Sequence, residues 1–243
     1  MDPITQFKKE REEAVSAMGK DRELQKKSLD WMIAADKYLY TYNYSWLGRP
    51  IIKYPNDIVA MQEIIWNVKP DLIIETGIAH GGSIIFYASM LELIGRGEVI
   101  AVDIDIRKHN REKIEQHPMY KRITMLEGSS VDPNIIKKIR GYVKKSNVAM
   151  VFLDSLHTHD HVLEEMRLYH PFVTIGSYMV LPDTFVEFFP KGYFKGKPVD
   201  VGNNPMTAIR SFMKENDDFI VDRLINDKLC ITEGFDGYLK RVK

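Results

Sequence analysis

Five short apolar segments alternate with helical stretches along most of this chain, and this alternation limits its fold more than any other feature. The apolar segments are residues 72–76, 99–105, 123–128, 148–154 and 177–183. The intervening stretches with helical character are residues 82–95, 107–116, 132–145 and 159–170. Continuous apolar strands separated by helices are typical of a parallel sheet that is covered on both faces. The sequence therefore predicts an α/β fold with a mostly parallel sheet.

The N-terminal region predicts a helical extension in front of this sheet. Residues 7–40 are rich in charged side chains and carry a partial apolar stripe at helical spacing. A tyrosine-rich link follows, and Pro55 then opens a further predicted helix that runs to about residue 68. We therefore divide the chain into an N-terminal helical extension with an aromatic link, residues 1–50, and one α/β domain, residues 51–243.

The C-terminal region predicts an antiparallel edge to the sheet. A helix fits residues 205–215, and residues 219–242 contain two β-like runs. Asn226 and Asp227 lie between these runs and are typical turn residues. We expect the two runs to form an antiparallel pair joined by a turn at these residues.

Composition excludes several classes of function. The chain has 243 residues and a formal net charge of +0, which suits one sizeable domain and gives no support for nucleic acid as a partner. Its one cysteine, Cys230, cannot form an internal disulfide, as is usual in a reducing cytosol. The N-terminus lacks the apolar core of a signal peptide, and no apolar run reaches the roughly 20 residues that span a bilayer. We expect a cytoplasmic protein without an integral membrane segment.

Polar residues follow the first predicted strand, at the edge where open α/β sheets bind ligands. Residues 75–83 read Glu-Thr-Gly-Ile-Ala-His-Gly-Gly-Ser, and the glycines permit a tight turn with close backbone approach before a helix. A turn that only packs the helix is the alternative. The spacing departs from the G-x-G-x-x-G pattern, which argues against NAD.

Two more strand ends extend this picture. Asp103 closes the second predicted strand, where a carboxylate can bind the two hydroxyls of a ribose; a helix cap is the alternative. Gly128, Ser129 and Ser130 follow the third strand and offer small polar groups beside an adenine. Together the three ends predict a nucleoside pocket of the kind that holds S-adenosylmethionine.

Four motifs carry a resemblance to a known family. They are WLGRPIIKYPNDIVAMQEIIWNVKPDLIIETGIAHGGS, AVDIDIR, EGSSVDP and LDSLHTHDHV. Over residues 45–240 the chain resembles the cephalosporin hydroxylase family, which includes sugar and rhamnosyl O-methyltransferases. The resemblance implies a Rossmann-like class I methyltransferase fold, S-adenosylmethionine and, as in several relatives, magnesium. We expect the cofactor to contact Glu75, Gly77, His80, Gly81, Ser83, Asp103, Ser129, Ser130 and Asp154.

The resemblance also implies catalytic residues. In similar metal-dependent sugar O-methyltransferases an Asp-x-x-His pattern supplies a metal ligand and a general base, and here it matches Asp154 and His157. A bound cation lowers the pKa of a sugar hydroxyl while an imidazole removes its proton. Relatives carry Glu-Asp after the fifth strand, where this chain has Pro182 and Asp183. Asp154 and Asp183 could therefore hold magnesium; the alternative is that metal binding is lost and Asp183 only caps or orients.

The other residues of the histidine-rich stretch predict simpler roles. Thr158 and Asp160 fit the cap and first turn of the next helix. We expect His159 to face solvent or a partner, and His161 to pack or cap. A three-histidine zinc site is not predicted, because no H-E-x-x-H pattern is present.

Two further segments allow alternatives. Residues 202–205, Gly-Asn-Asn-Pro, could shape a substrate pocket, or Asn204 could be a plain helix cap before Pro205. The aromatic loop 185–196 could be a substrate lid or a contact between subunits.

The function predicted from these features is methyl transfer to a hydroxyl, with a sugar of a glycolipid, surface polysaccharide or natural product as acceptor. One alternative is a part in the hydroxylation or methoxylation of a small metabolite. Another is a protein that binds S-adenosylmethionine without catalysis. The apolar surface of the N-terminal extension further predicts a homo-oligomer.

Overall fold

A seven-stranded sheet forms the centre of the molecule. The computed structural model describes residues 2–144, 146 and 148–243, and within this part the strands lie in the order β5-β4-β3-β6-β7-β9-β8. The strands are β3 (Leu72–Thr76), β4 (Glu98–Asp103), β5 (Ile123–Glu127), β6 (Ala149–Leu153), β7 (Tyr178–Val180), β8 (Phe219–Val221) and β9 (Tyr238–Arg241). β3 to β7 run parallel, and β9 is antiparallel to both β7 and β8. The predicted α/β class and mostly parallel sheet are confirmed.

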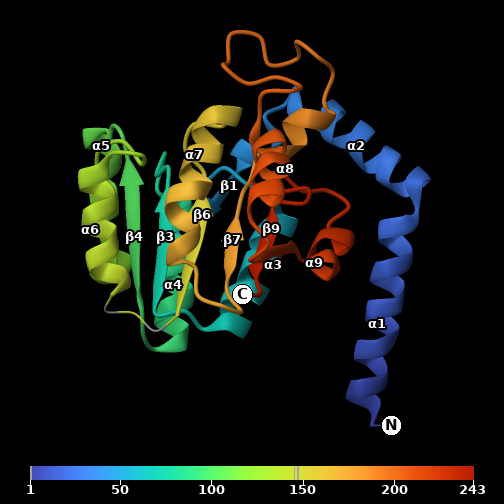
Figure 1. The fold of residues 1–243 in the computed structure, drawn as a ribbon, viewed down its shortest axis with the longest axis horizontal. Helices are drawn as coiled ribbons and strands as arrows, with labels where there is room; N and C mark the ends of the chain where they lie inside the picture. Colours follow the sequence, from blue (N-terminus) through green and yellow to red (C-terminus); the bar gives the residue numbers. More distant parts are fainter. Residues whose placement is uncertain (1, 145, 147) are drawn as a thin grey trace.

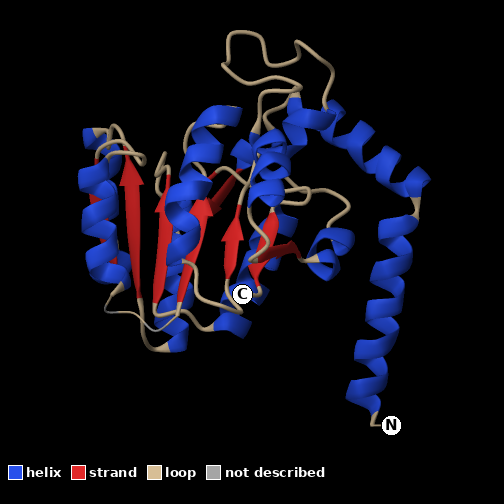
Figure 2. Cartoon of the chain, in the orientation of Figure 1, coloured by secondary structure: helices blue, strands red, loops and turns tan. Residues whose placement is uncertain are grey.

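Helices cover both faces of this sheet, as Figure 2 shows by colour. One apolar core joins Ile73 of β3 to α3 (Pro55–Val68), α4 (Gly82–Ile94) and α5 (Lys108–Glu115). The other joins Ile74 to α6 (Pro133–Val143), α7 (His159–Tyr169) and α8 (Pro205–Glu215). Because successive strand residues point to opposite faces, apolar side chains at every position are needed to bury both. The helix predicted over 132–145 ends at Val143, and residue 145 lies outside the described part.

The C-terminal edge confirms one prediction and corrects another. β8 and β9 are antiparallel, as expected, but no turn at Asn226 and Asp227 joins them. Both residues lie in α9 (Arg223–Lys228). Asp222 caps this helix by accepting hydrogen bonds from the backbone of Leu224 and Ile225, so the local cap prevails over the turn propensity.

The N-terminal extension is helical, as predicted from residues 7–40, and consists of two helices. α1 (Pro3–Lys20) and α2 (Arg22–Asp36) meet at Asp21, whose side chain accepts a hydrogen bond from Leu24 N at 2.9 Å and caps α2. In Figure 1, α1 runs down one side of the molecule and α2 leads up to the end where the parallel strands finish. A 3₁₀ turn (Tyr40–Asn43) and the hairpin β1 (Tyr44–Trp46) and β2 (Arg49–Ile51) then lead into the domain. In the described part of the chain, no helix combines the length and apolar character needed to cross a bilayer.

The strand order places the site. After β3 the chain builds outward to β4 and β5, and then returns to place β6 on the other side of β3. Ligands of open α/β sheets bind beyond the carboxyl ends of the strands at such a reversal. The carboxyl ends of β3, β4 and β6 all lie there.

Candidate active site

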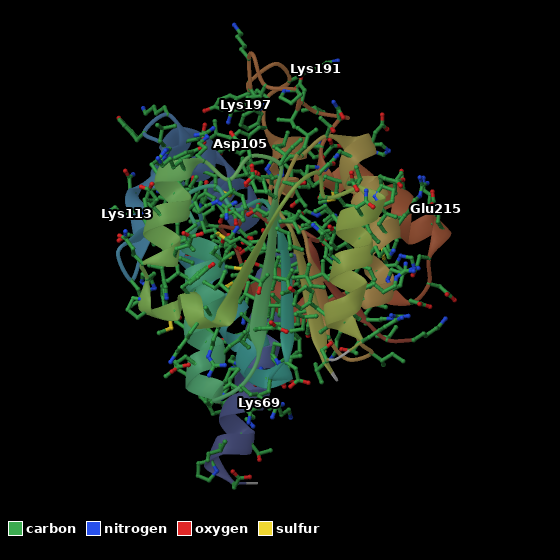
Figure 3. The ribbon with its side chains drawn as sticks, turned by 90° about the vertical axis from the view of Figure 1, so that its left-hand side faces the viewer. Lys69, Asp105, Lys113, Lys191, Lys197 and Glu215 are labelled. Atoms are coloured by element: carbon green, nitrogen blue, oxygen red, sulfur yellow. The ribbon has the colours of Figure 1, made fainter. Side chains whose placement is uncertain are left out.

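A cavity of about 610 Å³ opens at the carboxyl ends of these strands. The loops after β3, β4, β5 and β6 line one part of it, and the loop after η4 (Thr184–Phe188) together with the end of α2 lines another. Lys197 from the later loop and Asp105 from the β4 loop lie at the same end of the molecule in Figure 3. The volume is in the usual range for a small-molecule site.

The loop after β3 has its shape imposed by two residues. Gly77 has φ +90°, and a Cβ there would collide with the backbone carbonyl of Asp154, so glycine is required. Asp103 Oδ2 accepts hydrogen bonds from Ile78 N at 2.7 Å and from Ala79 N at 3.3 Å. Asp103 therefore positions the glycine loop while it also lines the cavity.

The structure brings most of the predicted cofactor residues together. The cavity is lined by Gly77, His80, Ser83, Asp103, Ser129, Ser130 and Asp154. Glu75 and Gly81 do not line it. Gly81 faces the side chain of Ile114. Glu75 is fully buried beneath the loop, where its Oε2 accepts a hydrogen bond from Ser83 Oγ at 2.8 Å. Burial and the charge of Asp154 raise the pKa of Glu75 to about 8, and its Oε1 has no hydrogen-bond partner in the described residues.

Asp154, His157 and Asp183 form one cluster, here called the carboxylate–imidazole cluster. Asp154 follows β6, His157 lies in the next loop, and Asp183 follows β7. His157 Nε2 lies 3.0 Å from Asp183 Oδ2 and 3.8 Å from Asp154 Oδ1. One ligand atom from each residue lies within 4.8 Å of the others. Each side chain is about a quarter exposed, so the cluster is open to the cavity.

The charges of this cluster control the protonation of its histidine. Burial lowers the pKa of His157, but the charges of Asp183 and Asp154 outweigh burial and raise it to about 9. In turn, the His157 charge outweighs the burial of Asp183 and holds the pKa of that carboxyl below its usual value. The imidazole is therefore protonated at neutral pH as long as both carboxylates keep their full charge.

The cluster fits a divalent cation. Two carboxylates that converge on one point offer the oxygen ligands that magnesium prefers, and water or substrate can complete its coordination. Pro182, the residue before Asp183, offers no ligand atom. A cation on Asp154 and Asp183 would offset the two charges that hold the proton on His157.

Lys53 was missed by sequence reasoning, although it contacts this cluster. Its side chain is buried, and Nζ lies 3.0 Å from Asp154 Oδ2 and 2.7 Å from Glu233 Oε1. Burial lowers the pKa of Lys53, but the two carboxylates outweigh it, so the pKa is raised and the lysine stays charged. This ion pair fixes Asp154 with its other oxygen, Oδ1, toward His157. The available signal was a lone lysine between Ile52 and Tyr54 in an apolar stretch.

The two other histidines of the stretch lie outside the cluster. The prediction that His159 faces solvent or a partner is wrong: its Nδ1 lies 2.8 Å from Thr207 Oγ1, so it joins α7 to α8. His161 Nε2 contacts Ser130 Oγ at 3.2 Å and Ser155 Oγ at 3.1 Å, and His161 also lines the cavity. His161 thus packs against polar groups beside the predicted adenine turn.

The cap predictions are borne out in position. Thr158 is the N-cap residue of α7, without a side-chain cap hydrogen bond, and Asp160 lies in the first turn. Instead of the Thr158 side chain, Asn203 Oδ1 accepts a hydrogen bond from the backbone N–H of His159, at 2.8 Å. Asn204 caps α8 through a capping box with Thr207, which agrees with the plain-cap alternative for residues 202–205.

The aromatic loop 185–196 packs against its own chain. Phe189 stacks on Phe194 with ring centroids 5.5 Å apart, and both join a cluster that includes Met32 of α2 and Tyr54. Phe185 and Phe194 also line the cavity. The loop therefore forms part of the cavity wall, and both alternatives for it, a substrate lid and a contact between subunits, stay open.

Comparisons with known proteins point to one family. The family model described as rhamnosyl O-methyltransferase/CmcI matches residues 38–242. Rhamnosyl O-methyltransferases of Mycobacterium leprae and Mycobacterium tuberculosis are each 30% identical to the chain over 203 residues; the match covers 81% of this chain and 82% and 78% of theirs. A solved structure of CmcI with Mg and SAM has a TM-score of 0.59 at 19% identity, and covers 83% of this chain and 78% of its own. This structural likeness supports the fold.

Proposed function

We propose that this chain, which belongs to the rhamnosyl O-methyltransferase/CmcI family, is an S-adenosylmethionine-dependent methyltransferase that acts on a hydroxyl of a sugar. The observation that carries the proposal is the carboxylate–imidazole cluster, which opens into the same cavity as the glycine loop and Asp103. One cavity therefore contains both a candidate base, His157, and a candidate nucleoside site beside Asp103. The acceptor sugar is part of a glycolipid, a surface polysaccharide or a natural product.

The part of the cavity lined by Gly77, Asp103, Ser129 and Ser130, here called the nucleoside half, holds the cofactor. Asp103 accepts hydrogen bonds from the ribose hydroxyls, while Ser129 and Ser130 lie beside the adenine. S-adenosylmethionine supplies a methyl group on a positively charged sulfur. The contribution of the chain is to hold the acceptor oxygen in line with that methyl group, since alignment supplies much of the rate in such transfers.

His157 removes the proton of the acceptor hydroxyl. Nε2 is the receiving atom, because it faces the cavity-lining carboxylates, whereas Nδ1 is buried without a hydrogen-bond partner in the described residues. Nε2 can accept this proton when a bound cation offsets the charges of Asp154 and Asp183, and Asp183, 3.0 Å away, then stabilises the imidazolium that results. Asp154 and Asp183 would hold a divalent cation, with magnesium the expected ion, and this ion would lower the pKa of the hydroxyl.

Cofactor binding provides the first test. Calorimetry on the full chain should show binding of S-adenosylmethionine and of its demethylated product, S-adenosylhomocysteine. Asp103→Ala should weaken both by about 10–100-fold, because it removes charge-assisted hydrogen bonds to the ribose and to the glycine loop. Asp105→Asn, an exposed neighbour, serves as the matched control and should bind normally. Binding of NAD by a wild-type chain that ignores both compounds would overturn the assignment.

We also propose that the enzyme is a homo-oligomer. The first half of α1 exposes Ile4 (68%) and Phe7 (64%), while the end of the helix packs against α9, where Gly19 meets Asp227. Projecting apolar side chains of this kind often contact another subunit. Sedimentation should therefore show an oligomer at micromolar concentration, and Ile4→Glu combined with Phe7→Glu should dissociate it. Leu93→Glu, equally exposed on α4, should not. A wild-type monomer would rule the proposal out.

We also propose a cytoplasmic location and a division of the chain into two parts. The single cysteine, Cys230, is in keeping with a cytoplasmic location. The division into a 1–50 extension and a 51–243 domain stays a prediction.

A further inference from the structure

The cavity extends beyond the nucleoside half, and the motifs that predict cofactor binding do not account for this extension. Asp36, from the end of α2, lines it together with Tyr42 and Tyr54. Phe185 and Phe194 of the aromatic loop line it as well. This acceptor half, defined by these five residues, adjoins the carboxylate–imidazole cluster. It is therefore the part of the cavity from which a hydroxyl can reach His157.

Asp36 is an acidic residue that the fold leaves free to bind a ligand. It is half-buried, and none of the ion pairs in the described part of the chain involves it. Burial and the neighbouring Asp36, as a hydrogen-bond acceptor and as a charge, raise the pKa of Tyr193. An ionised carboxylate can accept several hydrogen bonds through its two oxygens, so one donor leaves capacity for others. Asp36 also precedes the matched region 38–242, so the family resemblance assigns it no role.

The aromatic side of the acceptor half is apolar, and its rings pack against one another. Phe194 stacks on Phe189, and Phe185 lies 6.0 Å from Phe194 between ring centroids. Such rings present apolar faces against which the C–H face of a sugar ring can pack. A carboxylate and an aromatic wall in one cavity match a pyranose, which has hydroxyl donors on its rim and C–H groups on its face.

The charges around the acceptor half favour a neutral ligand. Asp36 and Asp183 both line the cavity, and Lys53 is already paired with Asp154 and Glu233. His157 is charged as well, but Asp154 and Asp183 offset its charge, and Lys197 is exposed and lies over the Phe194 ring at 5.7 Å. A sugar that carries its own carboxylate would meet Asp36 with like charge.

We infer that Asp36 and the Phe185–Phe194 wall form a subsite for a neutral pyranose, in which Asp36 accepts hydrogen bonds from sugar hydroxyls while another hydroxyl faces His157. This inference rests on the proposed function. It adds that the N-terminal extension supplies a specificity-determining residue of the acceptor site.

The test compares matched variants of the full chain. The acceptors are 4-nitrophenyl pyranosides of rhamnose, glucose, galactose and mannose, with 4-nitrophenyl glucuronide as the charged comparison, and the readout is S-adenosylhomocysteine formed. Asp36→Asn should raise the acceptor KM by about 10–100-fold, because a hydrogen bond to a charged group is lost, with kcat little changed. The affinity for S-adenosylhomocysteine, measured by calorimetry, should stay within about twofold of wild type, since Asp36 is outside the nucleoside half. Asp30→Asn makes the same change on the exposed face of α2 and should behave as wild type.

A second pair of variants probes the aromatic wall. Phe194→Leu should raise the acceptor KM, whereas Phe188→Leu, in the same loop but absent from the cavity lining, should not. If the wild type methylates a neutral pyranoside and Asp36→Asn has the wild-type KM, the inference is wrong and the proposed function stands. A preference for the glucuronide would likewise overturn the inference alone. If the wild type binds S-adenosylhomocysteine but methylates none of these sugars, the sugar acceptor and the subsite fall together.

Discussion

Replacement of His157 with alanine should lower turnover by about 10²–10⁴-fold, the range typical for loss of a general base. The reason is geometric: Nε2 faces the two carboxylates at the cavity floor, 3.0 Å from Asp183, and no other imidazole belongs to the cluster in the described residues. Affinity for S-adenosylhomocysteine should hardly change, because His157 faces the acceptor and not the nucleoside. Steady-state kinetics with saturating cofactor, paired with calorimetry, measures both quantities.

The control for this variant is His109→Ala, because His109 is exposed on α5. It should keep wild-type turnover. His159→Ala is a less clean control, since His159 bonds to Thr207 and joins two helices. Full activity of His157→Ala on the true acceptor would remove His157 from the mechanism.

Removal of divalent cations should lower turnover by at least about 10²-fold, since a bound Lewis acid contributes several kcal/mol. EDTA treatment followed by titration with magnesium should abolish and then restore activity. Calorimetry without any acceptor should show magnesium binding to the wild type. Asp183→Asn should weaken this binding, because it removes one of two carboxylate ligands. Asp105→Asn, outside the cluster, is the control.

The two outcomes of the chelation experiment separate the parts of the mechanism. Activity that survives EDTA while His157→Ala is inactive would refute the metal site and leave a catalytic role for His157. Pro182, which offers no ligand atom beside Asp183, would then account for the missing metal.

The sequence predicts those parts of the fold that depend on local pattern. The apolar runs at 72–76 and 148–154 correspond to β3 and β6, because a strand buried on both faces needs apolar residues at every position. The turn at Asn226 and Asp227 fails for an equally local reason, since the Asp222 cap starts a helix there instead. The helical character of residues 7–40 is confirmed, and Asp21 divides this region into two helices by capping the second one.

The sequence predicts the site residues that belong to one short motif. It does not predict those that come from segments far apart in the sequence. Asp154 and His157 are three residues apart, and their pattern can be recognised directly. Lys53 reaches Asp154 across 101 positions and Glu233 across 180, and no periodicity links such residues. His159 was misjudged for the same reason, because Thr207 is 48 positions away. Asp36 is likewise a single acidic residue at a helix end until the fold brings it to the cavity.

The Lys53 ion pairs have a consequence for biosynthesis on the ribosome. Asp154 is held by a lysine from the first quarter of the chain, which is in turn held by Glu233 near the last strand, where Asp57 Oδ2 accepts a hydrogen bond from Glu233 N at 2.9 Å. During translation the segment around residue 233 emerges after the β3 to β7 strands are complete. Until it docks, Lys53 lacks one of its two carboxylates and Asp154 lacks its fixed orientation. A nascent chain can thus build the parallel part of its sheet before the segment around residue 233 completes the ion pairs of Lys53 and fixes Asp154.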